Sequence, residues 1–118
     1  MSIIELANAW LRNNYPSDIS NSLRVSKYHS PQDLWFFTLP TSYFDSEKKG
    51  NLNILLQYEN DHDQFHFLKV PFSFLRTNRN KLDIRSTGDQ FDIHISAKKS
   101  SWLVCTRSDN VSFSEYKQ

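Results

Sequence analysis

Short apolar and aromatic runs, separated by polar segments, constrain the fold of this chain more than any other feature. The runs are residues 23–26, 34–39, 52–58, 65–70, 91–95, 102–106 and 111–113. Runs of this length are typical of β-strands, and the high aromatic and low glycine content agrees with a compact, strand-rich chain. About seven short strands predict a mainly β protein, built as a small barrel or sandwich.

Helices are predicted at three places. Residues 2–14 place apolar side chains on one stripe of a helix, and a nearby proline should end it. Ser2 and Glu5 have the spacing of a capping box at its start. Short helices are expected directly after Pro40 and Pro71, because proline is tolerated at the first helical position. The two junctions resemble each other, either as an internal repeat or as a coincidence.

Length and composition indicate a single domain over residues 1–118. The net charge is only +1, so nucleic-acid binding would require local clusters of charge. The single cysteine, Cys105, excludes an internal disulfide, suits a reducing cytoplasm and is expected to be a buried structural thiol. Because we find neither a signal-peptide pattern nor an apolar window long enough to span a membrane, we predict a cytoplasmic protein with no membrane partner.

Patterns for catalysis and metal binding are weak. His62 and His66 have helical spacing, but their segment predicts a charged turn entering a strand, where that spacing separates the two rings. Asp33 followed by Glu-Lys-Lys at 47–49 superficially matches metal-dependent nucleases, although the second group is predicted to lie at a helix end. The sequence carries neither a nucleophile motif nor a phosphate-binding glycine loop. We therefore predict a non-catalytic protein with no cofactor and no metal.

Two polar segments interrupt the apolar runs, the first at 24–33 and the second at 76–90. Both interleave arginine or lysine with amide, hydroxyl and carboxylate side chains. Arginine and lysine neutralise phosphates, and arginine, lysine, asparagine and glutamine also recognise base edges. We predict that these segments bind nucleic acid. The alternative interpretation is a pair of solvated, charged loops.

Several short stretches carry a resemblance to a known family. They are Asn8-Ala9-Trp10-Leu11, Leu23-Arg24-Val25-Ser26, Leu39-Pro40 with Ser42, the loop 76–81 ending near Arg85 and Gly88, and Ser101-Trp102-Leu103-Val104-Cys105-Thr106. On these residues the chain resembles the B3-like DNA-binding pseudobarrel domains of restriction endonucleases, and most of all the N-terminal effector domain of EcoRII.

The resemblance implies both a fold and a function. The fold would be a seven-stranded open pseudobarrel with an N-terminal helix and short helices after Pro40 and Pro71. Two loops, an N-arm at 24–33 and a C-arm at 76–90, would project toward the same side and enter the major groove of double-stranded DNA. The domain would be a non-catalytic monomer in the bacterial cytoplasm. It would act as the effector or target-recognition domain for the nuclease domain of a type II restriction endonuclease, and the EcoRII type implies a CCWGG site (W being A or T).

Roles for the arm residues follow from side-chain chemistry. Candidates for binding guanine N7 and O6 are Arg24, Arg79, Lys81 and Arg85. Candidates for accepting a hydrogen bond from a cytosine amino group are Asp33 and Asp83. Other base or phosphate contacts are assigned to His29, Gln32, Asn78 and Asn80, and phosphate contacts to Ser26, Lys27, Tyr28, Arg76 and Thr77.

Two other functions remain open. A single-stranded nucleic-acid or RNA-binding β-barrel would expose Trp35, Phe36 or Tyr28 for base stacking, whereas we expect the strand aromatics to lie in the core. A β interaction module that binds protein or sugar would use both arms as ordinary loops. Competition between duplex and single-stranded oligonucleotides separates the two nucleic-acid functions, and failure to bind any nucleic acid at low salt favours the interaction module.

Overall fold

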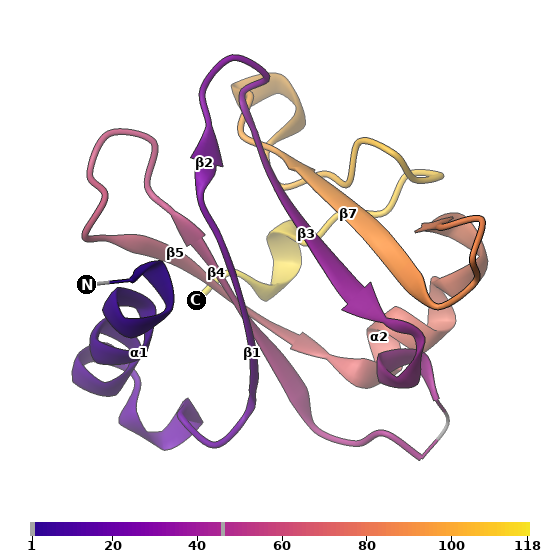
Figure 1. The fold of residues 1–118 in the computed structure, drawn as a ribbon, viewed down its shortest axis with the longest axis horizontal. Helices are drawn as coiled ribbons and strands as arrows, with labels where there is room; N and C mark the ends of the chain where they lie inside the picture. Colours follow the sequence, from indigo (N-terminus) through magenta and orange to yellow (C-terminus); the bar gives the residue numbers. More distant parts are fainter. Residues whose placement is uncertain (1, 46) are drawn as a thin grey trace.

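Two β-sheets form the frame of the protein in a computed structural model that describes residues 2–45 and 47–118 (Figure 1). The first sheet has the order β1-β4-β5 and consists of β1 (Ser22–Ser26), β4 (Asn51–Gln57) and β5 (Phe65–Pro71). The second has the order β2-β3-β7-β6 and consists of β2 (Tyr28–His29), β3 (Leu34–Pro40), β7 (Gln90–Ser96) and β6 (Asp83–Ile84). Strands β1 and β4 are parallel, and all other pairs are antiparallel. The prediction of a mainly β protein is confirmed, and the described strands form no closed barrel.

The main core lies between the two sheets. Strand β3 alternates, with Trp35, Phe37 and Leu39 buried and the residues between them only partly covered. Strand β7 contributes the buried side chains of Phe91, Ile93 and Ile95, as its alternating pattern predicted, and β4 and β5 contribute Leu52, Ile54, Leu56, Leu68 and Val70. Because alternate side chains of a strand point to opposite faces, this pattern leaves every second residue of β3 and β7 on the outer face of the second sheet.

Helix α1 (Ile3–Asn14) covers the other face of the first sheet. Ser2 caps the helix in the predicted capping box with Glu5, and the helix ends before Pro16, as expected. Its buried side chains, Ala7 and Leu11, pack in a second cluster with Leu55, Phe65 and Phe67. Strand β4 therefore has apolar contacts on both faces, which explains why the run at 52–58 is nearly continuous in apolar residues.

Short helices follow both strand–proline junctions, as predicted. The 3₁₀ helix η2 (Thr41–Phe44) begins after Pro40, and α2 (Phe72–Thr77) begins after Pro71. Both prolines have extended ψ angles, 149° and 138°, so each is the N-cap residue of its helix and the last residue of its strand, one position before the expected first helical position. The remaining turns of 3₁₀ helix are η1 (Pro16–Asp18), η3 (Arg79–Lys81), η4 (Lys99–Ser101) and η5 (Ser114–Tyr116). No helix among the described residues is both long and apolar enough to cross a membrane.

The last two predicted strands are wrong. Residues 102–106 and 111–113 make isolated bridges, Ile95 to Cys105 and Val104 to Ser112, and no continuous ladder. The φ angle of Leu103 is +62°, a left-handed conformation that a regular strand excludes. Cys105 is nevertheless buried, as predicted, and its burial raises the pKa of the thiol. Strands β2 and β6 were not predicted, because each has only two residues and lies inside a polar arm.

Side chains connect the two sheets along β1 and β3. The hydroxyl of Ser26 donates to the carbonyl oxygen of Phe36 at 2.8 Å and accepts from its N–H at 3.1 Å. The Nε of Arg24 donates to the carbonyl oxygen of Thr38 at 3.1 Å. We call this row of contacts the β1–β3 seam. It holds the edge strand β1 of the first sheet against the part of β3 that does not pair with β2, without a backbone ladder.

Candidate nucleic-acid interface

The N-arm is an exposed hairpin at one end of the second sheet, at the top of Figure 1. Tyr28 pairs with Trp35 and His29 pairs with Leu34, so β2 lies beside the first residues of β3. The Tyr28 hydroxyl donates to the Asp33 carboxylate at 2.5 Å, across the base of the hairpin. The Asp33 carbonyl oxygen accepts from the Ala97 N–H at 3.0 Å, which joins the hairpin to the segment after β7.

Positive charge gathers at this end of the molecule. Lys27, His29 and Gln32 of the N-arm are exposed, and so are Lys98 and Lys99 in the neighbouring turn. Contacts among serines support that turn, because the Ser96 hydroxyl lies 2.7 Å from the Ser101 hydroxyl and accepts from the Lys98 N–H at 3.1 Å. We call Lys27, His29, Gln32, Lys98 and Lys99 the basic end. Lys98 and Lys99 were not among the candidates chosen from the sequence. Their position in the turn after the predicted strand at 91–95 indicated that they would be exposed.

An acidic loop at 58–64 borders the other flank of the N-arm. The side chain of Gln57 joins them, because its oxygen accepts from the Tyr28 N–H at 3.4 Å and its nitrogen donates to the His62 carbonyl oxygen at 3.2 Å. Glu59, Asp61 and Asp63 are exposed in this loop. A polyanion would therefore approach the N-arm from the side of Lys98 and Lys99.

The C-arm lies at the opposite end of the second sheet, so the expectation that both arms project toward one side is wrong. Strand β6 pairs with Phe91 and Asp92, and the turn at 85–89 leads into Gln90, which lies opposite Pro40. The N-arm instead leads into Leu34, at the other end of β3. The two ends of β3 are roughly 20 Å apart at about 3.3 Å per residue. The physical reason is that β3 and β7 are antiparallel, so the loops that precede them emerge at opposite ends.

Two predicted N-arm contacts are used inside the protein. Ser26 is 3 % exposed, and its hydroxyl is part of the β1–β3 seam, so it is not available for a phosphate. Arg24 also donates to the Leu23 carbonyl oxygen at 3.2 Å, and its guanidinium lies 5.1 Å from the ring centre of Tyr43. The structure therefore corrects the assignment of Ser26 to a phosphate and of Arg24 to guanine.

Three predicted C-arm contacts belong to the end of α2. Arg76 donates to the carbonyl oxygens of Lys48 and Asp45, at 2.5 and 3.3 Å. The Thr77 hydroxyl donates to the Ser73 carbonyl oxygen at 2.9 Å, and the Asn78 amide donates to the Phe74 carbonyl oxygen at 2.8 Å. The Thr77 and Asn78 side chains thus bond back to carbonyl oxygens one turn earlier in α2, and Arg76 links the helix to the backbone of Asp45 and Lys48. All three side chains therefore have partners within the protein, and their assignment to DNA stays a prediction.

The rest of the C-arm is exposed but mixed in charge. Arg79, Asn80, Lys81 and Arg85 are exposed, and the buried side chain of Leu82 anchors the segment. Arg85 donates through Nε to the Asp92 carboxylate at 2.7 Å, and Asp83 lies opposite Asp92 in the β6–β7 ladder. Arg79 lies 5.6 Å from the ring centre of Phe91.

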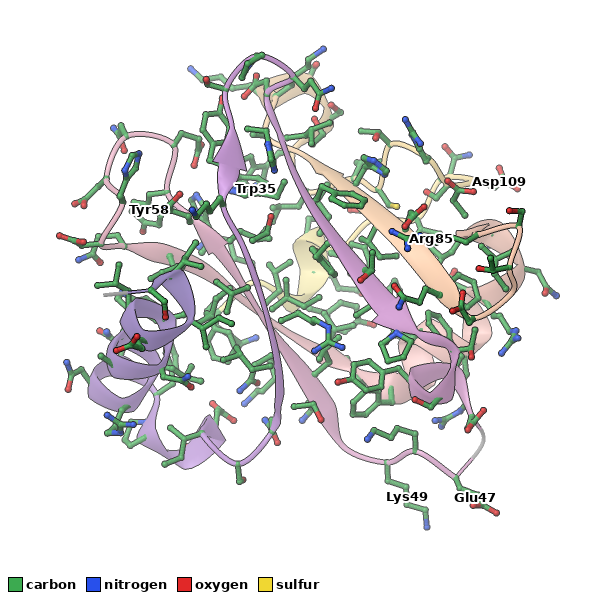
Figure 2. The ribbon with its side chains drawn as sticks, viewed as in Figure 1. Trp35, Glu47, Lys49, Tyr58, Arg85 and Asp109 are labelled. Atoms are coloured by element: carbon green, nitrogen blue, oxygen red, sulfur yellow. The ribbon has the colours of Figure 1, made fainter. Side chains whose placement is uncertain are left out.

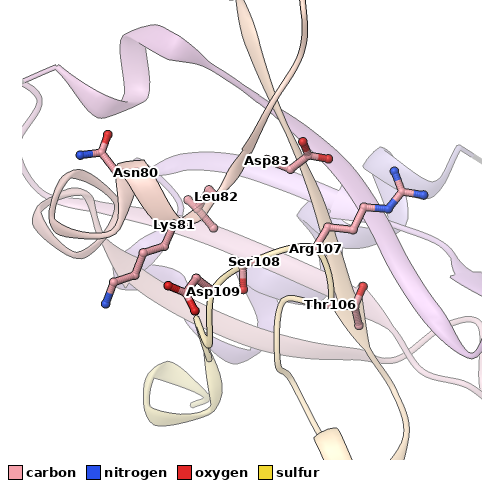
Figure 3. A pocket seen from close by; sticks show the side chains of 8 residues that line it. All are labelled: Asn80, Lys81, Leu82, Asp83, Thr106, Arg107, Ser108 and Asp109. Carbon is pink, nitrogen blue, oxygen red and sulfur yellow. The ribbon is translucent and has the colours of Figure 1, made fainter.

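An open cleft of about 620 Å³ borders the C-arm (Figure 3). Its lining residues are Asn80, Lys81, Leu82, Asp83, Thr106, Arg107, Ser108 and Asp109. The Asp109 N–H donates to the Lys81 carbonyl oxygen at 2.9 Å, which closes the floor of the cleft. Lys81 and Arg107 are balanced by Asp83 and Asp109. The basic end carries three lysines with no such balance among its own members, so it is the better candidate for phosphates.

The weak nuclease and metal patterns do not converge in space. Asp33 directly precedes the first residue of β3. Glu47 and Lys49 follow η2, which begins at the other end of β3, and they lie at the bottom of Figure 2. Within residues 2–45 and 47–118, no three histidine, cysteine or carboxylate side chains are grouped as metal ligands. His66 instead lies 2.8 Å from Glu59 and packs against Trp35 and other aromatic rings.

No protein-family model, curated protein or solved structure matches this chain. The case for a function therefore depends on the chemistry and placement of its own side chains. These side chains form an exposed, cationic hairpin at one end of the second sheet and a mixed-charge arm at the other end.

Proposed function

We propose that this protein binds double-stranded DNA through the basic end. The observation that carries the proposal is the N-arm hairpin, which presents Lys27, His29 and Gln32 to solvent while internal bonds hold its base. Lys98 and Lys99 extend the cationic surface beside it. Lysines neutralise phosphates without regard to sequence, whereas histidine and glutamine offer hydrogen bonds to base edges.

The shape of the N-arm supports insertion into the major groove. A two-stranded β-ribbon fits a groove about 12 Å wide, and each base pair presents a distinct set of donors and acceptors there. Gln32 lies near the tip of the hairpin, and His29 lies on β2, the first strand of the hairpin. In this proposal the two side chains contact bases, while Lys27, Lys98 and Lys99 contact the flanking phosphates.

We further propose that the fold is a B3-like open pseudobarrel. The β1–β3 seam joins the sheets on one side. On the other side, residues after β7 form a chain of bridges, from Ile95 to Cys105, from Val104 to Ser112 and from Lys117 to Leu68. These contacts support a nearly closed wall of strands and turns around the main core. They agree with the pseudobarrel that the sequence resemblance implies.

The same resemblance supports a restriction-enzyme context. The chain would be the non-catalytic effector or target-recognition domain of a bacterial type II restriction endonuclease, and a separate nuclease domain would cut. A CCWGG duplex is the first sequence to test. Arg79, Lys81 and Arg85 of the C-arm would then contact a stretch of DNA backbone away from the N-arm, because they lie at the far end of β3.

The test compares two charge-matched triple variants. Lys27→Ala/Lys98→Ala/Lys99→Ala removes the lysines of the basic end, and Arg12→Ala/Lys49→Ala/Lys117→Ala removes three exposed cations that lie outside both arms. We expect the first variant to weaken duplex binding and to reduce the slope of log affinity against log salt by about 0.9 for each phosphate that it no longer neutralises. The second should retain most of the affinity and slope. Fluorescence anisotropy over a salt series measures both.

Sequence recognition is tested separately. Sites selected from a random duplex library define the preferred sequence, and His29→Ala and Gln32→Ala are then measured on that site and on random DNA. Loss of about 1–3 kcal/mol on the selected site alone indicates base contacts. Equal behaviour of the two triple variants would reject the basic end as the DNA site. Absence of duplex binding at low salt would reject the function and favour a protein or sugar partner.

A further inference from the structure

The outer face of the second sheet carries an aromatic pair that the core does not use. Phe36 of β3 and His94 of β7 alternate with buried neighbours and are only partly covered. The two residues lie directly opposite each other in the β3–β7 ladder. Their ring centres are 4.6 Å apart with 42° between the ring planes. The two rings therefore form one continuous patch across the two central strands.

Two of the three aromatic residues named at first for base stacking, Trp35 and Tyr28, make other contacts. Trp35 is fully buried, and its Nε1 donates to the Gln57 carbonyl oxygen at 2.8 Å. Tyr28 is bound to Asp33 through its hydroxyl and packs against Trp35. Phe36 is the only one of these three aromatics on the outer face of the second sheet, and His94 was not considered from the sequence.

Two arginines lie beside β7 near the Phe36–His94 pair. Arg107 follows Thr106, whose N–H donates to the His94 carbonyl oxygen at 2.8 Å, and Arg107 is exposed. Arg85 is held by Asp92, which lies two residues from His94 on the same face of β7. Figure 3 shows Arg107 extending from its loop, with Asp83 pointing to the same side.

The protonation state of His94 is consistent with a stacking role. Burial lowers the pKa of its imidazole, and the charge of Arg107 lowers it further. A neutral imidazole next to a phenyl ring is less strongly hydrated than an imidazolium and leaves its ring face free for stacking. Asp83 and Asp92 offset part of the arginine charge, and their carboxylates can accept hydrogen bonds from base amino groups.

We propose that this face binds an unpaired stretch of nucleic acid, with a base stacked on Phe36 and His94 and the adjacent phosphates on Arg85 and Arg107. Single-strand binding surfaces combine aromatic side chains that stack bases with cations that follow the backbone. A duplex cannot use the ring pair in this way, because its bases are stacked on each other. None of these residues belongs to the basic end, so either proposal can fail while the other stands.

The first experiment measures binding of a fluorescent oligothymidylate and needs no variant. An abasic oligonucleotide of the same length and charge serves as the competitor. We expect the base-bearing strand to bind about tenfold or more tightly than the abasic strand, because stacking requires bases. Equal binding of the two strands, or no binding of oligothymidylate at low salt, would overturn the proposal.

The second experiment locates the site. Phe36→Leu keeps an apolar side chain but removes the ring, whereas Phe36→Tyr keeps the ring. We expect Phe36→Leu to lose about tenfold or more of the oligothymidylate affinity and Phe36→Tyr to stay within about twofold of the unmodified protein. Arg107→Ala, an exposed loop change that spares the packing, should flatten the salt dependence.

Duplex binding distinguishes the two proposals. If the unmodified protein binds duplex but not oligothymidylate, the stacking face is wrong and the basic end stands. If Phe36→Leu folds and binds oligothymidylate as tightly as the unmodified protein, the Phe36–His94 pair is not the site. If Phe36→Leu does not fold, an unchanged salt dependence in Arg107→Ala would equally overturn the proposal.

Discussion

At the scale of single residues, the hydroxyl of Ser26 has the most consequence for the fold. It is buried and bridges both backbone groups of Phe36, at 2.8 and 3.1 Å, where no ladder joins β1 to β3. Buried polar backbone groups without a partner are costly, because they lose hydrogen bonds that water made in the unfolded chain. One side chain therefore replaces part of a sheet at the β1–β3 seam.

Removing this hydroxyl should destabilise the protein. Ser26→Ala leaves the N–H and carbonyl oxygen of Phe36 without this partner, and we expect the free energy of unfolding to fall by about 1–3 kcal/mol. Urea denaturation followed by circular dichroism measures the change. Ser100→Ala, an exposed serine in η4, is the control and should shift stability by less than about 0.5 kcal/mol. A loss no larger than that of the control would show that the seam is not held by Ser26.

At the scale of elements, the long periodic segments were predictable and the two-residue strands were not. Helix α1, the five longer strands and the helices after Pro40 and Pro71 follow from apolar periodicity, capping and proline chemistry. Strands β2 and β6 have too few residues to show a period, and tertiary pairing with β3 and β7 creates them. Residues 102–106 were wrongly predicted as a strand. Their apolar run does not reveal the left-handed backbone of Leu103, which depends on packing.

The candidate site was also predictable only in part, because tertiary contacts decide which polar side chains face solvent. Lys27, His29 and Gln32 were placed in a polar loop, and the structure shows them exposed in the N-arm hairpin. Arg24 and Ser26 are also polar, but their side chains bond within the β1–β3 seam. No pattern in a single sequence distinguishes a polar residue that faces solvent from one that bridges two strands. The orientation of the C-arm required the antiparallel pairing of β3 and β7.

The N-arm as an element should lose part of its support at high pH. The hydrogen bond to Asp33, with smaller effects of burial and of the Asp33 charge, raises the pKa of Tyr28 from 10.0 to about 12. Because the folded protein holds the phenol proton more tightly than the unfolded chain, this stabilisation is complete below pH 10. It is lost progressively as the pH rises from 10 to about 12.

Thermal unfolding at a series of pH values tests this expectation. Tyr28→Phe removes the titrating group, so the difference in melting temperature between the unmodified protein and the variant should be constant below pH 10. The difference should shrink between pH 10 and about 12. Asp33→Asn removes the carboxylate and should also abolish the pH dependence of that difference. A difference that stays constant across the whole window would contradict the Tyr28–Asp33 bond.

At the scale of the whole molecule, the basic end and the stacking face are continuous. His29 pairs with Leu34, and Phe36 lies two residues further along β3 on the same face. Two residues of strand span roughly 7 Å. A duplex held at the N-arm would therefore place an unpaired extension of one strand on the outer face of the second sheet. That extension would run past Phe36 and His94 toward Arg85 and the C-arm.

This continuity predicts a preference for duplexes with a single-stranded tail. When one ligand engages two linked sites, the second contact becomes intramolecular and overall affinity exceeds that of either part. We expect a duplex with a short thymidine tail, on the 3′ or the 5′ side, to bind about tenfold or more tightly than the blunt duplex. Competition anisotropy with both tails and the blunt form measures the gain.

Phe36→Leu should abolish the gain and leave blunt-duplex binding unchanged, whereas the basic-end triple variant should weaken the binding of both ligands. A gain that survives in Phe36→Leu would place the tail elsewhere, and no gain in the unmodified protein would mean that the two surfaces do not act on one ligand.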